Sequence, residues 1–334
     1  MDREQEEMQF LGPIGILEES YKTIMSCRRV LSQITLFLIL PLALLILIHI
    51  EVSDVVLNKI VNNEVDLSDA QVGSPKYDKL SDLVSSEWTF LILFKLAYFT
   101  FLLIFSLLST SAVVYTIACV YTARDVSFKK VMSVVPKVWK RLMVTFLWTI
   151  LAFFVYNVVA TIFLFVAVLF IFSISYKAGL GFIAVFSVLY VVGFVYLSLV
   201  WQSASVVSVL EEARGIQAMN KSRALLKGKV WTAIFVYGIL TLLSFGLQYA
   251  FQKLVVYGGR FGNLERVFYG MICLLVSVKL ILSALVIQTV LYFVCKSYHH
   301  ENIDKSALSD HLEVYLGEYV PLTAKDVQLE QYHV

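Results

Sequence analysis

The chain has 334 residues, of which 59% are hydrophobic and only 16% are charged, and its mean hydropathy is +0.79. A soluble domain carries about 45–50% apolar and about 25% charged residues, so this composition excludes an ordinary water-soluble fold. The formal net charge of +2 argues against direct nucleic-acid binding. The four cysteines are dispersed and show the spacing of neither a metal site nor a disulfide framework.

Three regions follow one another along the chain. Residues 1–29 are predicted to form a cytoplasmic N-terminal tail with an amphipathic helix that uses Ile14, Leu17, Tyr21, Ile24 and Met25. Residues 30–295 are predicted to form a membrane domain, and residues 296–334 a cytoplasmic C-terminal tail.

The membrane domain contains six apolar runs, each long enough for the roughly 20 residues that a spanning helix needs. They cover residues 30–50, 89–116, 144–172, 179–209, 230–256 and 267–295. We therefore predict an all-α integral membrane protein with six transmembrane helices.

Charges in the connections predict the orientation. The connection at 51–88 has eight acidic and three basic residues. The connection at 117–143 has six basic residues and one acidic residue, and that at 210–229 has five and two. Basic loops stay in the cytoplasm, which places both chain ends there. We expect an endomembrane, the endoplasmic reticulum or Golgi, rather than the plasma membrane.

An internal repeat runs from about 106–153 to about 198–245. Lys137-Val138-Trp139 recurs as Lys229-Val230-Trp231, and Ala123-Arg124 recurs as Ala213-Arg214. Each copy contains a span, a basic cytoplasmic segment and a returning span. This pattern predicts repeated hairpins of parallel orientation, as in some transporters.

The basic cytoplasmic segments are amphipathic. In the first, Phe128, Val131, Met132, Val135, Val138, Trp139 and Leu142 fall on one helical stripe; the second uses Ile216, Met219, Leu226 and Val230. Such a helix can lie in the membrane interface with its basic residues toward anionic headgroups, or it can brace the bundle. The candidate lipid contacts are Lys129, Lys130, Lys137, Lys140, Arg141, Lys227 and Lys229.

The sequence contains no recognisable catalytic or metal-binding motif, so we predict no enzyme activity and no cofactor. Lys279 lies near the middle of the sixth apolar run, where a charge costs roughly 2.5–3.5 kcal/mol. It is expected to face the bundle interior or a wet cavity, which Asn157, Gln202 and Gln248 could share. There it could receive an anionic group, or it could be deprotonated or bonded to backbone carbonyls.

Two stretches carry a resemblance to known families. The run from Leu210 to Ala218, continued by Lys221-Ser222-Arg223 and Leu226-Lys227-Gly228, resembles the membrane domain associated with some glycerophosphoryl diester phosphodiesterases. Nearly the whole chain resembles a plant family of uncharacterised six-pass membrane proteins. The first resemblance implies a membrane domain without hydrolase activity, because nothing here matches the separate catalytic barrel.

Some members of that plant family are labelled as binders of a polyadenylate-binding protein. The segment 310–321 is similar to the short peptide that docks on the C-terminal domain of that protein. The resemblance implies partner contacts through Leu312, Glu318, Tyr319, Val320 and Pro321, with Tyr319 in place of the usual Phe. The alternative is a tail that packs under the bundle.

Two hypotheses on function follow. The first is a non-enzymatic membrane protein that binds or transports a lipid or anionic solute. The second is a membrane adaptor that recruits a polyadenylate-binding protein through its tail.

Overall fold

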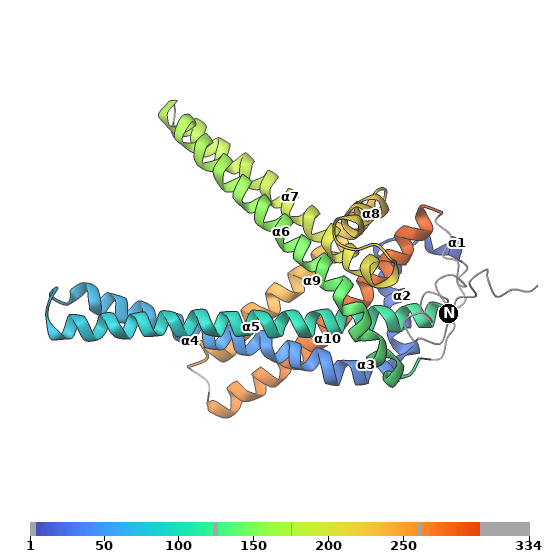
Figure 1. The fold of residues 1–334 in the computed structure, drawn as a ribbon, viewed down its shortest axis with the longest axis horizontal. Coiled ribbons are helices and arrows are strands. Elements are labelled where there is room, and N and C mark those ends of the chain that lie inside the picture. The colour runs from blue at the N-terminus through green and yellow to red at the C-terminus, as the bar shows by residue number, and fades with distance from the viewer. Residues whose placement is uncertain (1–4, 123–125, 175, 260–261, 301–334) are drawn as a thin grey trace, which may run out of the picture. The chain divides into compact units, whose positions relative to one another are not determined.

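The computed structural model describes residues 5–122, 126–174, 176–259 and 262–300. These residues form helices and short connections without a β-strand (Figure 1). In chain order the helices are α1 (Gln5–Met8), α2 (Pro13–Ser26), α3 (Arg28–Ile34), the π-helix η1 (Thr35–Ile39), α4 (Leu40–Asp69), α5 (Pro75–Tyr121), α6 (Phe128–Ile174), α7 (Tyr176–Leu210), α8 (Ile216–Leu226), α9 (Val230–Phe251), the π-helix η2 (Gln252–Val256) and α10 (Asn263–Tyr298).

Six helical segments in the described part of the chain are long and apolar enough to cross a membrane. They are Arg28–Asp69, Pro75–Tyr121, Phe128–Ile171, Tyr176–Leu210, Val230–Val256 and Asn263–Tyr298. Each contains or coincides with most of one predicted run, so the all-α class and the presence of six helices able to span a membrane are confirmed.

The chain divides into two compact units. Unit 1 comprises residues 1–11, 114–227 and 289–334, and unit 2 comprises residues 12–113 and 228–288. Helices α5 and α10 therefore contribute one end to each unit.

In unit 2, the first connection is a helical hairpin rather than the loop that its acidic composition suggested. Helices α4 and α5 continue well beyond their apolar runs and reverse only between Asp69 and Pro75 (Figure 1). Within this hairpin, the residues of α4 that face inward recur at spacings of three and four positions; they are Ser53, Val56, Ile60, Asn63 and Leu67. This is the spacing of a coiled coil. Packing between the two helices along this seam stabilises them, although their polar composition alone would not.

Polar contacts fix the register of this hairpin. Asn63 donates a hydrogen bond of 2.8 Å to Glu87, and Lys59 forms an ion pair of 2.9 Å with the same carboxylate. One residue further along, Trp88 donates to Glu64 at 3.0 Å.

In unit 1, α6 and α7 form a hairpin whose helices lie side by side (Figure 1). No described residue at 151–171 or 180–198 is buried. Neither helix has a charged residue between Leu142 and Ile174 or between Ala178 and Leu210. Aromatic rings fill the seam instead, as where Phe153 packs on Phe194 with ring centroids 5.3 Å apart.

The two copies of the predicted repeat differ at their basic segments. In the first copy the segment forms the first turns of α6 and continues through Pro136 into the span. In the second it forms the separate helix α8, because the chain turns at Gly228, where φ is +88°. The repeat itself stays a prediction from the sequence.

Candidate functional site

The basic segment at the start of α6 buries its apolar stripe within the protein. Val131, Val134, Val135, Val138 and Leu142 are at most 1% exposed. All of these except Val134 belong to the predicted stripe, and their side chains contact protein rather than lipid. The other predicted members, Phe128, Met132 and Trp139, are half-buried. This favours the bracing alternative for residues 128–142 and leaves the opposite face of the helix to the solvent or headgroups.

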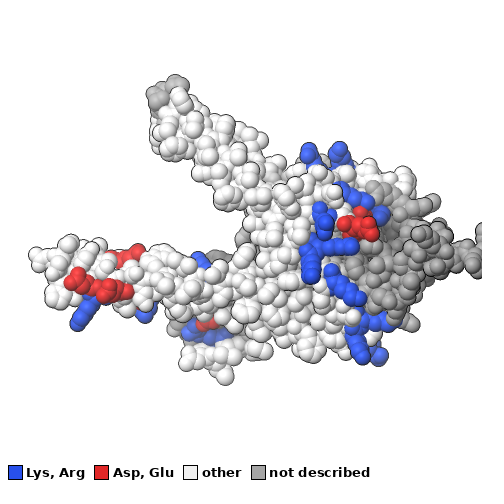
Figure 2. Space-filling view, viewed as in Figure 1, with Lys and Arg blue, Asp and Glu red and all other residues white. Residues whose placement is uncertain are grey.

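Lysines cover that opposite face. Lys129, Lys130, Lys137 and Lys140 are exposed, and Arg141 is half-buried. Among the described residues, Lys129, Lys130 and Lys140 have no carboxylate within ion-pair distance. Figure 2 shows Lys and Arg gathered at the base of the α6–α7 hairpin, whose outer part carries no charge on the face in view.

The second basic segment is α8, which packs on the end of α7. Ala218, Ser222, Leu225 and Leu226 are its buried residues, and the Ser222 hydroxyl donates to the Val200 carbonyl at 2.9 Å. Of the predicted stripe, Leu226 is buried but Ile216 is 47% exposed. Lys227, which follows α8, is exposed, and Lys229, at the start of α9, is half-buried.

A histidine stabilises the C-terminal end of α8. The His299 Nε2 atom lies 3.1 Å from the Leu225 carbonyl oxygen and 2.9 Å from that of Lys227. These carbonyls lack partners within the helix, and a ring N–H satisfies them. His299 therefore has a structural role in unit 1.

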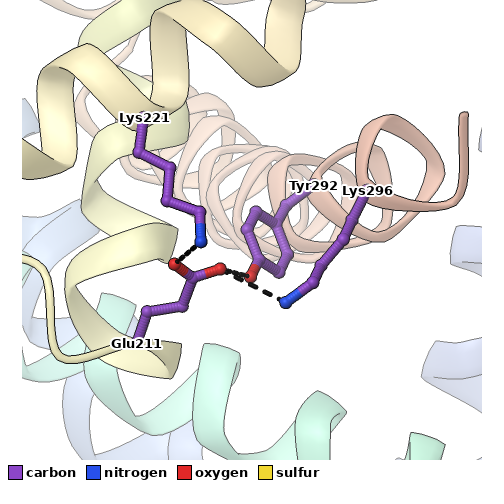
Figure 3. A network of polar contacts seen from close by, with 4 residues as sticks. All are labelled: Glu211, Lys221, Tyr292 and Lys296. Atoms are coloured by element: carbon purple, nitrogen blue, oxygen red, sulfur yellow. Dashed lines mark hydrogen bonds and ion pairs between the residues drawn. The ribbon is translucent and has the colours of Figure 1, made fainter. Parts of the chain in front are cut away.

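At the end of α7, Glu211 binds three side chains (Figure 3). Its Oε2 atom lies 2.6 Å from Lys221 Nζ on α8. Its Oε1 atom accepts a hydrogen bond of 2.5 Å from the Tyr292 hydroxyl and lies 3.3 Å from Lys296 Nζ, both on α10. One carboxylate thus links the three helices that converge in unit 1.

The charge of Glu211 is maintained in spite of its burial. Burial raises the pKa of this carboxyl, but hydrogen bonds from Lys221 and Tyr292 and the charges of Lys296 and Lys221 outweigh it. The net effect is a lowered pKa. An ionised, fully bonded carboxylate with low pKa suits a structural link and not a proton donor.

The sequence analysis missed this cluster. The available signal was an acidic residue at the start of an otherwise basic connection, but its partners lie 10, 81 and 85 positions further along the chain.

A buried hydroxyl layer adjoins the same connection. Thr145 on α6 and Ser208 on α7 share a hydrogen bond of 2.6 Å, and the Gly215 N–H donates to the Thr145 hydroxyl at 2.9 Å. Gly215 has φ of +59° and ψ of −128°, a conformation open to glycine and not to residues with a Cβ. The turn into α8 therefore depends on this glycine.

Comparison with known proteins identifies a family for this chain. A family model described as a domain of unknown function (DUF8558) matches residues 1–332. The chain belongs to this family. No curated protein and no solved structure matches the chain. In this DUF8558 chain the resemblances to the plant proteins and to the phosphodiesterase membrane domain stay predictions.

The four intramembrane candidates do not form one site within either unit. Asn157 and Gln202 belong to unit 1, whereas Gln248 and Lys279 belong to unit 2. Lys279 is exposed, so it does not face the interior of unit 2, and the alternative of a wet cavity stays a prediction. The reason is local: buried Cys273, Leu274, Ser277 and Val278 define the inward face of α10, and position 279 falls outside it.

Asn157 makes hydrogen bonds within the α6–α7 hairpin. Its Nδ2 atom donates to the Phe153 carbonyl, and its Oδ1 atom accepts a hydrogen bond of 2.7 Å from the Tyr190 hydroxyl. The Tyr156 hydroxyl donates in turn to the Tyr190 carbonyl at 2.7 Å. These bonds join α6 to α7 at a depth where lipid offers no hydrogen bonds.

The tail residues Leu312, Glu318, Tyr319, Val320 and Pro321 lie outside the described residues.

Proposed function

We propose that this protein is a non-enzymatic multi-pass membrane protein that binds anionic lipid, or an anionic solute, through its cytoplasmic basic surface. The observation that supports the proposal most is that the two faces of α6 have different environments. The apolar stripe that stabilises the fold is buried, while Lys129, Lys130, Lys137 and Lys140 are exposed. Of these, Lys129, Lys130 and Lys140 have no carboxylate within ion-pair distance in the described part of the chain, so their charges are available to a ligand.

The location of these lysines suits a membrane surface. They lie in the first four turns of α6, directly before an uncharged stretch long enough to cross the bilayer. Each Lys or Arg near an anionic leaflet contributes about 1 kcal/mol to the attraction. Lys129, Lys130 and Lys140 together supply about 3 kcal/mol on this scale, enough attraction to select anionic over zwitterionic lipid.

Helix α2 supports an additional contact with the membrane interface. Ile14, Tyr21 and Met25 are 77%, 60% and 48% exposed, whereas Ser20 and Thr23 on the other face are buried. The chain passes from α2 through Cys27 directly into the first span, which keeps α2 near the bilayer surface. We propose that its exposed apolar face lies in the headgroup region.

The first prediction concerns the lysines that begin α6. Lys129→Gln/Lys130→Gln is expected to weaken binding of phosphatidylserine by up to roughly 30-fold, since two charges contribute about 2 kcal/mol. Lipid-dependent thermal stabilisation of the full chain in detergent measures the change. Lys76→Gln/Lys79→Gln, in the first turns of α5, removes two lysines from the acidic hairpin and is the matched control. Equal loss in both variants would contradict the proposal.

The second prediction concerns orientation, for which we propose cytoplasmic chain ends in an endomembrane. Asp66→Asn completes the acceptor sequence N-L-S at residues 66–68, in the exposed hairpin roughly 24 Å along α4 from Ile50. It is expected to acquire a glycan in microsomes, and adding Ser68→Ala should abolish it. The natural sequon Asn220-Lys221-Ser222 is expected to stay unmodified. A glycan at Asn220 would contradict the proposed orientation and would indicate the opposite one.

The adaptor hypothesis depends on the match of segment 310–321 to the peptide bound by polyadenylate-binding proteins. A peptide of residues 305–334 is expected to bind the peptide-binding domain in the micromolar range, roughly −8 kcal/mol. Tyr319→Ala should abolish binding. A tail that does not bind would leave only the lipid proposal.

A further inference from the structure

Unit 2 contains a cleft of about 410 Å³, between α4, the end of α9 with η2, and the start of α10. Its volume lies within the range of ligand pockets, roughly 300–1,000 Å³. Leu47, Phe251, Met271 and Leu274 contribute apolar walls, and most of the other residues that line the cleft are apolar as well. An elongated apolar ligand is the class that such a lining accepts.

Two local features keep the cleft open. The π-helix η2 interrupts the regular turns of α9 and sets Val255 in the cleft wall; π-helical turns frequently mark functional sites. On α10, Gly270 leaves the opposite wall without a side chain. A Cβ added there would lie 3.9 Å from Val255 Cγ2, which is an ordinary van der Waals contact, so the backbone itself tolerates a side chain at this position. A larger residue at 270 would project into the space.

Polar groups line the same cleft. Glu51 comes from α4, and Asn263 and Arg266 come from the first turn of α10. The Arg266 Nε atom donates to the Val255 carbonyl at 2.9 Å, which anchors the guanidinium and leaves its terminal Nη atoms for a ligand. Among the described residues no ion pair joins Glu51 to Arg266. The cleft therefore presents a separate anion and a separate cation.

We propose that this cleft binds a zwitterionic glycerophospholipid that carries a primary amine. The lipid phosphate would bind Arg266, its ammonium group would bind Glu51, and an acyl chain would lie along Leu47, Phe251 and Met271. The charge pattern favours this occupant over an anionic lipid, because a bare phosphate would leave Glu51 unpaired beside it. The proposal is independent of the basic surface on α6, which lies in unit 1.

The test is native mass spectrometry of the full chain in detergent, titrated with dioleoylphosphatidylethanolamine and, separately, dioleoylphosphatidylglycerol. Arg266→Gln is expected to weaken binding of both lipids at least tenfold. Glu51→Gln should remove the preference for phosphatidylethanolamine without weakening phosphatidylglycerol binding. Lys253→Gln, on η2 but not in the cleft wall, is the charge control and should bind as the wild type does.

The steric variant separates cleft binding from nonspecific contact. Gly270→Leu is expected to abolish saturable binding, whereas Gly246→Leu, on the exposed face of α9, should leave it unchanged. Equal binding by Gly270→Leu and Gly246→Leu would overturn the proposal, as would a preference for phosphatidylethanolamine that survives Glu51→Gln. The Glu51 test does not depend on repacking, so it decides the matter even if Gly270→Leu fails to fold.

Discussion

Glu211→Ala is expected to lower the stability of the protein by about 3 kcal/mol. Removing the carboxylate leaves Lys296 Nζ and the Tyr292 hydroxyl without this partner in a site where the Lys296 side chain is only 18% exposed. Loss of one member of a buried charge pair costs roughly 3–5 kcal/mol. The lower end applies here because the Lys221 side chain is 35% exposed and can regain water.

The matched control is the neighbouring Glu212→Ala. Glu212 is exposed and carries the same charge one position later in the chain. Thermal unfolding of both variants in the same detergent measures the difference, and Glu212→Ala should unfold close to the wild-type temperature. If the two variants have the same unfolding temperature, Glu211 does not link the helices of unit 1.

The same carboxylate predicts a pH dependence. Because the folded protein holds the pKa of Glu211 below its ordinary value of 4.5, the unfolded chain takes up this proton first as pH falls. The stabilisation is therefore complete above about pH 4.5 and is lost as the pH falls through the lower, folded pKa. Glu211→Gln should lack this component, so its unfolding temperature should fall less than that of the wild type upon acidification.

Gly215→Ala is expected to have a comparable effect, about 3 kcal/mol, by a different route. The backbone conformation at Gly215 costs a residue with a Cβ of order 1–3 kcal/mol. In addition, the new Cβ would lie 2.7 Å from Trp148 Cδ1, so the indole or the turn must move. Movement of the turn would break the hydrogen bond from the Gly215 N–H to Thr145.

A helical glycine provides the comparison for this substitution. Gly238→Ala, within α9, meets no atom within 4 Å and should be neutral or slightly stabilising, because alanine favours helices by about 1 kcal/mol over glycine. Thermal unfolding again measures the effect. A wild-type unfolding temperature for Gly215→Ala would show that the turn before α8 adapts to a side chain.

Long apolar runs predicted the six spans correctly because twenty consecutive apolar residues have few other structures available. The ends of the helices were less predictable. The acidic composition of residues 51–88 suggested a loop, yet the spacing of Ser53, Val56, Ile60, Asn63 and Leu67 forms a coiled coil. That spacing was present in the sequence but was obscured by the surrounding charges.

The candidate sites were less predictable because they depend on tertiary contacts. The stripe from Val131 to Leu142 was visible in the sequence, but periodicity does not reveal whether such a stripe faces lipid or protein. Lys279 was assigned to the bundle interior or a wet cavity from its depth alone, and depth does not reveal that it lies outside the inward face of α10. Glu211 and the cleft beside Arg266 combine residues distant in sequence, which no local pattern reports.

The proposed anionic-lipid binding determines which lipids should accompany the protein, and this is a statement that can be tested directly. Extraction of the full chain from its native membrane into polymer-bounded discs, followed by lipid analysis by mass spectrometry, tests that statement without added ligand. Wild-type protein is expected to retain anionic lipid above its proportion in the bulk membrane, and Lys129→Gln/Lys130→Gln should lose most of this enrichment. A wild-type lipid composition equal to that of the bulk membrane would contradict the proposed anionic-lipid binding.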